Sequence, residues 1–454
     1  MSSENLDHLK VAFSTIGCRS NFADTMDLQT AALEYGITCL DFNEHADVYV
    51  LNTCTVTNGA DVQARRTVKN LRFKYPTARI VVTGCMAEVG FKDCPEACLA
   101  DAIIGTSRKS EVLAAILGKN IPAPGNDLVS LGSNFKEDLA PLSKSTPAPG
   151  TAAQGLAPRA RFHLRIQDGC DNLCTFCIVP SARGNSRAKP TAQVVEEIKT
   201  LGKIGYDEVV LTGTHLGGFG AEREESLLGL LRAMKKAKVS PRIRISSLDP
   251  NDVSAGLIDF IASSNLVCEH LHVCFQSFSN KMLKLMNRRY TMTEAIEAVS
   301  YAAAKIKGLC LGADLICGFP QETDDILNEQ LTAFKELPLS YLHVFPYSER
   351  QGTPATRLSG SIALNKRRER AQTWRALSVE RRSDYLKSKL NTEMEIIVER
   401  ITPDGHILGT SREYASCAVS PAASAKNIKI GRVLKVQAKE IGANKESLIC
   451  LQQT

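Results

Sequence analysis

Short apolar runs rich in Val and Ile recur along the N-terminal part of the chain, and each is followed by helix-like sequence. Three of them read VAFSTIGC, DVYVLNTC and RIVVTGC. This is the pattern of buried parallel strands in an open α/β sheet. Each run ends in a cysteine, namely Cys18, Cys54 and Cys85. Because the carboxyl ends of parallel strands share one edge of a sheet, we expect these thiols to lie together where ligands bind.

Three unrelated core cysteines are the alternative interpretation, but the shared position at strand ends argues against it. A Gly or an Asn-Thr pair leads into each cysteine and permits a tight turn. Cys94 and Cys98, in DCPEAC, lack partners of matching spacing, so we interpret them as structural.

The middle of the chain alternates strand and helix patterns six times. The strand patterns read RFHLRIQDG, DEVVLTGTHLG, RIRISSL, HLHVCFQSF, GADLICGFP and YLHVFPYS. Six right-handed βα units predict an open, partial (βα)6 barrel, whose chemistry belongs at the carboxyl ends of its strands. Cys268, Cys274, Cys310 and Cys317 fall in this region without ligand spacing and are predicted to be core residues.

Two composition changes divide the chain. Residues 133–160 are rich in Pro, Ala, Ser and Gly without periodicity, which is typical of a linker. Near Asn391 a basic helical stretch gives way to short alternating strands, which predict a small antiparallel β-barrel of the oligonucleotide-binding type. We therefore expect an α/β protein with an open-sheet domain at 1–132, a linker at 133–160, a partial barrel at 161–390 and a β-barrel at 391–454.

Composition and charge narrow the class of protein. The chain has 454 residues, 44% of them hydrophobic, and no apolar run of the roughly 18 residues that span a membrane. The N-terminus lacks a secretory signal, so we expect a cytoplasmic protein without disulfides despite 15 cysteines. Of the net charge of +6, the segment from Ser361 onward carries +7, from 17 Lys/Arg and 10 Asp/Glu. This basic segment indicates either a polyanion-binding surface or an ordinary solvated helix face.

The stretch GCDNLCTFC after the first barrel strand places Cys170, Cys174 and Cys177 at spacings of four and three. A structural zinc ion normally takes four protein ligands, and no fourth Cys or His with matching spacing follows nearby. A 4Fe–4S cluster, in contrast, can be held by three thiolates and keep one iron open. S-adenosylmethionine can chelate such an iron and be cleaved there to a 5′-deoxyadenosyl radical.

The CxxxCxxC motif, with Phe176 before its last cysteine, resembles that of radical S-adenosylmethionine enzymes. Together with the triad Cys18, Cys54 and Cys85, the chain resembles the methylthiotransferases among them. The resemblance implies two 4Fe–4S clusters, one on each triad, S-adenosylmethionine as cofactor, and an RNA-binding TRAM domain at the C-terminus. NTCTVTNGAD, GCDNLCTFCIVPSARGNSR and LTGTHLGGFG are similar to the branch that modifies carbon 2 of N6-threonylcarbamoyladenosine at position 37 of tRNA.

Several polar residues at strand ends are candidates for the cofactor pocket. Gly213 allows close backbone approach, and Ser246, Gln276 and Asp314 follow strands three, four and five. The alternative for each is a polar group that caps a strand. His215 is expected to contact substrate or structure rather than iron.

Other residues near the expected pocket leave alternatives open. Arg183 and Arg187 could meet phosphate or the cofactor carboxylate, or pair with nearby acids. Phe275, Phe278 and Gln321 depart from the residues usual in the family, which puts the detailed shape of the pocket in doubt.

Contact with tRNA is expected to be electrostatic, through the basic residues of 366–389 and through Lys429, Lys435 and Lys439 on one strand face. Arg432 would join them only if the strand is bulged near Gly431. We further expect an electron donor of the flavodoxin or ferredoxin type, a monomeric state and no membrane partner.

Two kinds of alternative function remain open. Within the family, the substrate could be isopentenyladenosine in tRNA or an aspartate of a ribosomal protein. A different class is a non-catalytic RNA-binding protein with structural zinc, which would explain the basic C-terminus but not two separate triads without fourth ligands.

Overall fold

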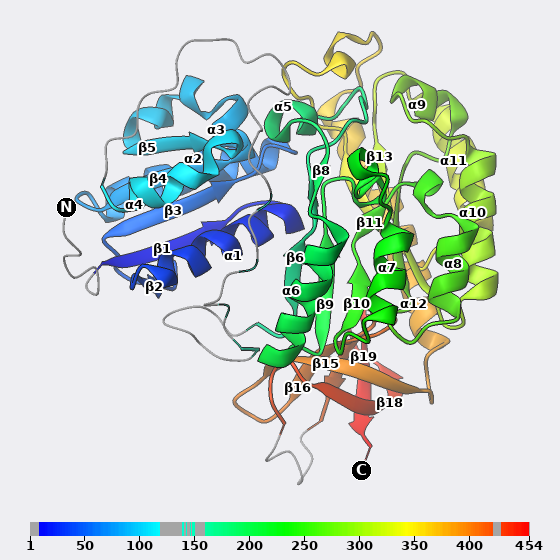
Figure 1. The fold of residues 1–454 in the computed structure, drawn as a ribbon. Helices are drawn as coiled ribbons and strands as arrows, with labels where there is room; N and C mark the ends of the chain where they lie inside the picture. Colours follow the sequence, from blue (N-terminus) through cyan, green and yellow to red (C-terminus); the bar gives the residue numbers. More distant parts are fainter. Residues whose placement is uncertain are drawn as a thin grey trace.

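The structure, a computed structural model, describes residues 9–118, 159–420 and 428–453, together with 139, 142, 146, 148 and 149. An N-terminal α/β part lies beside a larger α/β barrel, and a small β-barrel lies beneath them (Figure 1). The linker predicted at 133–160 falls almost entirely outside the described residues. None of the helices in the described ranges combines the length and apolarity needed to cross a membrane.

The N-terminal part is a five-stranded parallel sheet in the order β2-β1-β3-β4-β5. The central strand β3 is buried at every position, as its continuous apolar run predicted. Helices α1 and α4 pack on one face of the sheet and α2 on the other. The elements are β1 (Lys10–Thr15), α1 (Arg19–Glu34), β2 (Thr38–Leu40), β3 (Val48–Thr53), α2 (Asn58–Lys74), β4 (Arg79–Gly84), α3 (Cys85–Val89), β5 (Ala102–Gly105) and α4 (Val112–Ile116).

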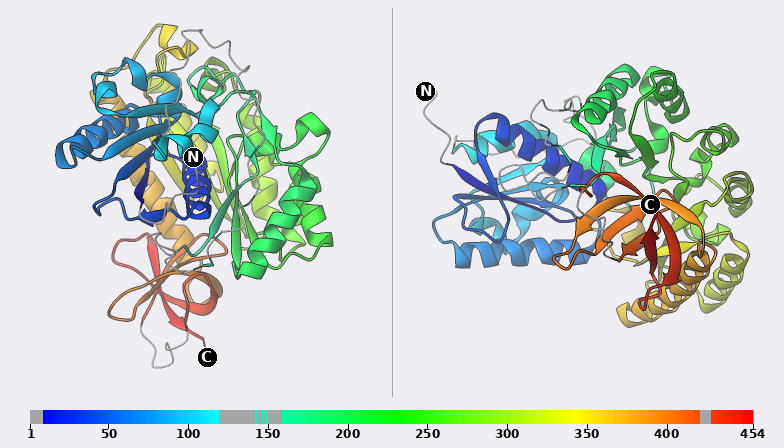
Figure 2. Two further views of the ribbon diagram at one scale, coloured as in Figure 1. Left: turned by 60° about the vertical axis from the view of Figure 1, so that its left-hand side comes forward. Right: turned by 90° about the horizontal axis from the view of Figure 1, so that it is seen from below.

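The central part confirms the predicted partial barrel of six βα units, whose helices form an outer layer (Figure 2). Strands β6, β9 and β10 form one sheet and β12, β13 and β14 another, and a parallel bridge between Ile243 and Val267 joins them. Within the described residues β6 and β14 do not pair, so the barrel stays open along one side. The strands are β6 (Phe162–Arg165), β9 (Glu208–Thr212), β10 (Arg242–Ile245), β12 (His270–Gln276), β13 (Cys310–Cys317) and β14 (Tyr341–Pro346).

Helices follow the strands of the barrel in turn. They are α6 (Thr191–Ile204), α7 (Leu227–Lys236), α8 (Ala255–Ala262), α10 (Met292–Lys305), α11 (Asp324–Glu336) and α12 (Leu364–Lys387). Shorter elements are β7 (Gln167–Asp168), α5 (Val179–Arg183), β8 (Arg187–Ala188), β11 (Ser247–Leu248) and α9 (Asn280–Leu285).

The N-terminal part covers the open side of the barrel and contacts both of its edges. On the β6 edge, Asp24 of α1 forms a buried ion pair with Arg165. Beyond β14, Arg350 donates to the carbonyl oxygen of Thr55 at 3.0 Å, just after the third strand of the N-terminal sheet. The strand ends of the sheet therefore face the strand ends of the barrel.

The C-terminal part is a closed barrel of five strands in the order β15-β16-β17-β19-β18. Its pairings are antiparallel as predicted, except that β17 and β19 pair in parallel. The strands are β15 (Glu393–Ile401), β16 (Ile407–Ser411), β17 (Ser416–Val419), β18 (Val433–Ile441) and β19 (Ser447–Gln452).

One loop of this β-barrel reaches under the α/β barrel. The ring of Tyr414 stacks on His270 of β12, with 4.1 Å between the ring centroids, and lies 5.5 Å from the guanidinium carbon of Arg244 on β10. Arg19 of α1 donates to the Tyr414 hydroxyl at 3.2 Å. Tyr414 therefore covers the amino-terminal end of the space inside the α/β barrel, which we call the lumen.

Candidate functional site

The three cysteines at the strand ends of the N-terminal sheet converge, as their positions predicted. Cys18 precedes α1, Cys54 follows β3 and Cys85 begins α3. The side-chain oxygen of Asn21 lies 3.9 Å from Sγ of Cys18 and 3.7 Å from Sγ of Cys85. Cys54 approaches the same point, because a Cβ on Gly17 would lie 2.7 Å from its Sγ.

Glycine is needed at two turns of this edge. Gly17 has φ of +115°, and a Cβ there would lie 2.3 Å from Cβ of Cys54. Gly84, just before Cys85, has φ of +97°, and its Cβ would lie 2.3 Å from the carbonyl oxygen of Thr53. Both are backbone conformations that L side chains rarely adopt, so these turns depend on glycine.

The second triad, Cys170, Cys174 and Cys177, lies on the loop between β7 and α5 at the carboxyl end of the first barrel strand. Backbone N–H groups of Asn172 and Val179 donate to Sγ of Cys170 and Cys177 at 3.4 and 3.5 Å. Burial raises the pKa of Cys177 to about 12, with further contributions from the neighbouring Cys174 and Cys170. The three thiols are therefore grouped, and a cationic centre would be needed to hold them as thiolates.

Each triad has one arginine hydrogen-bonded to a sulfur. Arg183 donates from Nε to Sγ of Cys85, and Arg288 donates from Nη1 to Sγ of Cys174, both at 3.3 Å. Sequence reasoning missed Arg288, which lies 114 residues from the cysteine that it contacts and carries no local signal. Hydrogen bonds to sulfur are one of the means by which proteins set the properties of iron–sulfur centres.

Arg183 and Arg187 pair with acids, which was one of the alternatives that the sequence left open. Arg183 is buried and contacts Asp24 and Asp168 at 2.8 Å each. Arg187 contacts the other oxygen of Asp168 at 2.9 Å. The network therefore links α1 of the N-terminal sheet to the cysteine loop of the barrel.

The spread of the thiols distinguishes between metal centres. In the described part of the chain, the groups of ligand atoms that all lie within 4.8 Å of one another contain His, Asp and no cysteine. Around a single zinc ion, a Zn–S bond of about 2.3 Å and tetrahedral angles place sulfur atoms about 3.8 Å apart. Both triads are wider than that, and soft thiolate ligands suit an iron–sulfur cluster. The residues present therefore fit a multi-iron cluster on each triad.

A cavity of about 210 Å³ lies beside the second triad, where Cys177 of the barrel loop lines it. Val56 and Thr57, just after Cys54 of the first triad, form another side of it. Gln276 and Asp314, two of the residues expected near the cofactor, line it from the ends of β12 and β13.

Other predicted pocket residues lie outside this lining. A Cβ on Gly213 would lie 2.7 Å from Oε1 of Gln167, so the close approach there is to a side chain of the protein itself. Ser246 is buried, and its hydroxyl has no hydrogen-bond partner among the described residues. His215 lies 3.2 Å from Asp252, which agrees with the expected structural or substrate contact.

The residues that depart from the family pattern lie away from the cavity. Phe275 and Phe278 are buried and pack on each other with ring centroids 5.3 Å apart. Gln321 donates its backbone N–H to Gly360 and has φ of +67°. These departures therefore leave the lining of the cavity unchanged.

The prediction of a core position is wrong for one of the four barrel cysteines. Cys268, Cys310 and Cys317 are buried, as expected. Cys274 is only partly buried, and its Sγ donates to Oδ2 of Asp314 at 3.3 Å. Its thiol therefore belongs to the polar side chains of the lumen.

Most cations of the basic C-terminal helix make intramolecular contacts, although Lys366, Arg368 and Lys387 are exposed, so the expected RNA contact of this helix stays a prediction for the exposed ones. Arg367 and Arg370 are buried and pair with Glu349 and Glu322. Arg375, Arg381 and Arg382 donate to backbone carbonyls, and Lys389 to Gly308. Most of the charge on α12 therefore holds this helix against the barrel.

The strand prediction for Lys429, Lys435 and Lys439 agrees with the structure more closely than the prediction for the helix. Lys435 and Lys439 of β18 are exposed, while Val436 and Ala438 are buried in the β-barrel core. Lys429 is also exposed. Arg432 precedes β18 and pairs with Asp207 at 3.0 Å, and the irregularity of the strand falls between Ala438 and Glu440 instead of near Gly431.

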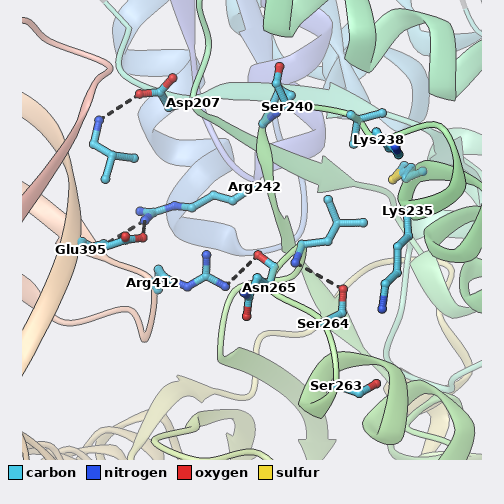
Figure 3. A pocket seen from close by; sticks show the side chains of 15 residues that line it. Asp207, Lys235, Lys238, Ser240, Arg242, Ser263, Ser264, Asn265, Glu395 and Arg412 are labelled. Carbon is cyan, nitrogen blue, oxygen red and sulfur yellow. Dashed lines mark hydrogen bonds and ion pairs between the residues drawn. The ribbon is translucent and has the colours of Figure 1, made fainter.

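A second cavity, of about 700 Å³, lies between the underside of the α/β barrel and the β-barrel (Figure 3). Arg242 points toward Glu395 there, and Arg412 donates to the carbonyl oxygen of Asn265 at 3.2 Å. No cysteine of either triad lines it. This space is an interface between the two barrels and lies apart from the thiols.

Comparisons with known proteins agree with this geometry. Residues 10–105 match the model of the uncharacterized protein family UPF0004, and residues 164–331 that of the radical SAM superfamily. The chain is 33% identical over 86% of its length to the threonylcarbamoyladenosine tRNA methylthiotransferase MtaB of Aquifex aeolicus, of which the match covers 93%. It is 31% identical over 86% of its length to a tRNA-2-methylthio-N(6)-dimethylallyladenosine synthase of Chloroherpeton thalassium, with 85% of that protein covered.

Among solved structures, the radical S-adenosylmethionine methyltransferase TsrM of Kitasatospora setae matches with a TM-score of 0.53 at 15% identity, over 76% of this chain and 74% of that one. This likeness supports the fold alone. The matches over both α/β parts, and the identity to relatives over nearly their whole length, lead to one conclusion: the chain belongs to the radical S-adenosylmethionine methylthiotransferase family.

Proposed function

We propose that this enzyme adds a methylthio group to carbon 2 of N6-threonylcarbamoyladenosine at position 37 of tRNA. One observation carries the proposal: a cavity lined by Cys177 of the barrel triad is also lined by Val56 and Thr57, which directly follow Cys54 of the N-terminal triad. A base in that cavity would be within reach of both metal centres. The relatives that act on modified adenosines of tRNA support tRNA as the substrate.

Each part of the chain has a role in this proposal. Cys18, Cys54 and Cys85, in the domain at 1–132, would hold one 4Fe–4S cluster, and Cys170, Cys174 and Cys177, in the domain at 161–390, the other. When bound, the clusters and S-adenosylmethionine supply the radical and the methylthio group. The β-barrel at 391–454 would contact tRNA, and a flavodoxin or ferredoxin would reduce a monomeric enzyme.

Residues of the chain fix the distance between the two triads. Arg183 contacts Cys85 on one side and Asp168, beside the cysteine loop, on the other. Lys109 adds a contact to Asp24 at 2.7 Å. Because these charges are buried and paired, the loss of one partner would leave an uncompensated charge, so the network resists separation of the two sheets.

Ile316, Phe345 and Ile178 give the cavity apolar walls. Gln276 and Asp314 supply polar groups at its lumen side. The hydroxyl of Ser246, buried without a partner among the described residues, is a further group available to S-adenosylmethionine.

Two triple variants test the proposal. Anaerobically reconstituted wild-type enzyme should hold about eight irons, the sum of two four-iron clusters. Replacing Cys18, Cys54 and Cys85 with Ala should leave about four irons, retain cleavage of S-adenosylmethionine and abolish product. Replacing Cys170, Cys174 and Cys177 with Ala should abolish both. Product formed by the first variant would overturn the role of the N-terminal triad.

Nucleoside mass spectrometry of tRNA from a deletion strain identifies the substrate. Loss of the methylthio derivative of threonylcarbamoyladenosine is the expected result. Loss of the derivative of isopentenyladenosine instead, or unchanged tRNA with an unmodified ribosomal-protein aspartate, would replace the proposed substrate. A colourless protein that carries zinc after anaerobic purification would exclude the enzyme altogether.

A further inference from the structure

Three polar side chains from adjacent strands meet in the lumen. His272 of β12, Asp314 of β13 and His343 of β14 are joined through one carboxylate oxygen: Oδ1 of Asp314 lies 2.9 Å from Nε2 of His272 and 3.5 Å from Nδ1 of His343. Asp314 and His343 are direct neighbours in the register of the two strands. We call these residues the His–Asp–His group.

The group is held by Tyr341 and Cys274, and its central residue Asp314 lines the cavity. Nδ1 of His272 lies 3.1 Å from the Tyr341 hydroxyl, and the Cys274 thiol occupies the second oxygen of Asp314. Burial opposes the ionisation of Asp314, but the imidazoles of His272 and His343 hold its pKa well below the usual range. An ionised carboxylate thus fixes the orientation of both rings.

His343 is the member that remains available. Its side chain is 48% exposed, and Asp314 is its only hydrogen-bond or ion-pair partner in the described part of the chain. Nδ1 faces Asp314, so Nε2 is free for a ligand. His343 also lines a neighbouring cavity of about 240 Å³, which places it between that space and the cavity that Asp314 lines.

The polar groups stand out against the rest of the wall. On the barrel side of the cavity, Ile316, Phe345 and Phe176 are apolar, Gln276 and Asp314 are polar at the lumen side, and Tyr347 and Ser348 are polar beyond β14. A ligand whose polar end enters the lumen would therefore meet Gln276 and the His–Asp–His group. A ligand with an apolar end would leave the amide of Gln276 and the free Nε2 of His343 without partners, which is costly.

We propose that His272, Asp314 and His343 determine substrate specificity, by binding an N6 substituent of adenosine that carries both hydrogen-bond donors and a carboxylate. Asp314 and Gln276 would accept its N–H and O–H groups, and His343, with an N–H on both ring nitrogens, would bind its carboxylate through Nε2. An isoprenoid substituent offers none of these groups and would be rejected. This inference rests on the proposed function and assigns the selection of its substrate to particular side chains.

Binding to anticodon stem-loop RNAs tests the proposal with the reconstituted enzyme under anaerobic conditions. The RNAs carry threonylcarbamoyladenosine, isopentenyladenosine or unmodified adenosine at position 37. Wild type should prefer the first, and His343→Ala should reduce that preference about 10- to 100-fold, as expected for the loss of a hydrogen bond to a charged group. His343→Gln, which retains a donor, should keep part of the preference. His45→Ala, at an exposed histidine of the N-terminal part, should change nothing.

The outcomes separate this inference from the proposed function. Wild-type enzyme that forms no methylthio product on the threonylcarbamoyl RNA would refute the function itself. Product formed normally, with the same RNA preference in His343→Ala and Asp314→Asn, would refute only the specificity role. One zinc per chain that both variants remove would also overturn it, because the group would then be a metal site. Far-ultraviolet circular dichroism and a thermal melt of His343→Ala check that the variant is folded.

Discussion

Arg183 donates a hydrogen bond from Nε to Sγ of Cys85 at 3.3 Å, although Arg183 ends α5 of the barrel and Cys85 begins α3 of the N-terminal part. The guanidinium of a buried arginine therefore lies directly on a sulfur proposed to hold the N-terminal cluster. A donor and a positive charge at this position stabilise the more negative, reduced form of a cluster.

Replacement of Arg183 by Gln should shift the potential of the N-terminal cluster to a more negative value, because the charge and the N–H···S bond are both lost. Redox titration monitored by electron paramagnetic resonance measures the shift, with the other cluster as internal reference. Arg187→Gln is the matched control, since Arg187 contacts Asp168 but no sulfur in the described residues. Equal potentials in the two variants would contradict the role of Arg183.

Gly17→Ala should release the N-terminal cluster. The new Cβ would lie 2.3 Å from Cβ of Cys54, at a φ of +115°, so Cys54 must move. Iron content after reconstitution should fall by about half, with cleavage of S-adenosylmethionine retained. Gly90→Ala, where a Cβ has no neighbour within 4 Å, should keep all the iron. Full iron in Gly17→Ala would show that this close approach is not needed.

Lys435 and Lys439 should contribute to tRNA binding through charge. Each phosphate contact adds about 0.7 to 0.9 to the slope of log affinity against log salt, so Lys435→Gln/Lys439→Gln should reduce the slope by roughly 1.4 to 1.8. Fluorescence anisotropy at several salt concentrations measures it. The control is Lys199→Gln/Lys203→Gln on α6, and an equal loss there would indicate diffuse attraction without a defined surface.

Arg370→Gln should weaken the fold while leaving the salt slope of tRNA binding unchanged. Arg370 is buried against Glu322 and Asp324, and breaking a buried pair from one side costs about 3–5 kcal/mol. Urea unfolding should show the loss. A variant with normal stability and a smaller salt slope would restore the RNA-binding role that the sequence suggested for this helix.

Glu208 should make the stability of the enzyme depend on pH in the acid range. Burial would raise the pKa of Glu208, but the guanidinium groups of Arg244 and Arg242 outweigh it and lower the pKa to about 2. Because the folded-state pKa lies below the ordinary value of 4.5 for glutamate, the stabilisation is complete above about pH 4.5 and is lost as the pH falls toward 2.

The stability difference between wild type and Glu208→Gln should therefore be largest near pH 7 and shrink below pH 4.5. Urea unfolding at several pH values measures this difference. Glu196→Gln, at an exposed glutamate, should show no such trend. A difference that stays constant down to pH 3 would mean that Glu208 is not ionised in the folded state.

Much of the architecture could be predicted because it follows local pattern. Continuous apolar runs gave the buried strands, and the rule that parallel strands end at one edge brought Cys18, Cys54 and Cys85 together. The spacing of Cys170, Cys174 and Cys177 likewise predicted the second group of thiols. Gln276 and Asp314 were found because they follow barrel strands.

The sequence could not predict contacts between residues that are distant along the chain. The charges on α12 were visible, but not that Glu322 and Glu349 neutralise two of its arginines. Nothing in the sequence around Arg288 indicates its contact with Cys174. The apolar neighbours of Cys274 indicate a core position, and they do not predict its contact with Asp314. The parallel pairing of β17 with β19 likewise depends on closure of the β-barrel.

Tyr414 stacks on His270 and lies beneath Arg244 at the amino-terminal end of the lumen. We therefore expect ligands to enter from the opposite end, where the thiol triads lie. Under the proposed function, a small cofactor seated in the lumen would have to bind before a polynucleotide that covers this entrance, so binding would be sequential, with the nucleic acid last.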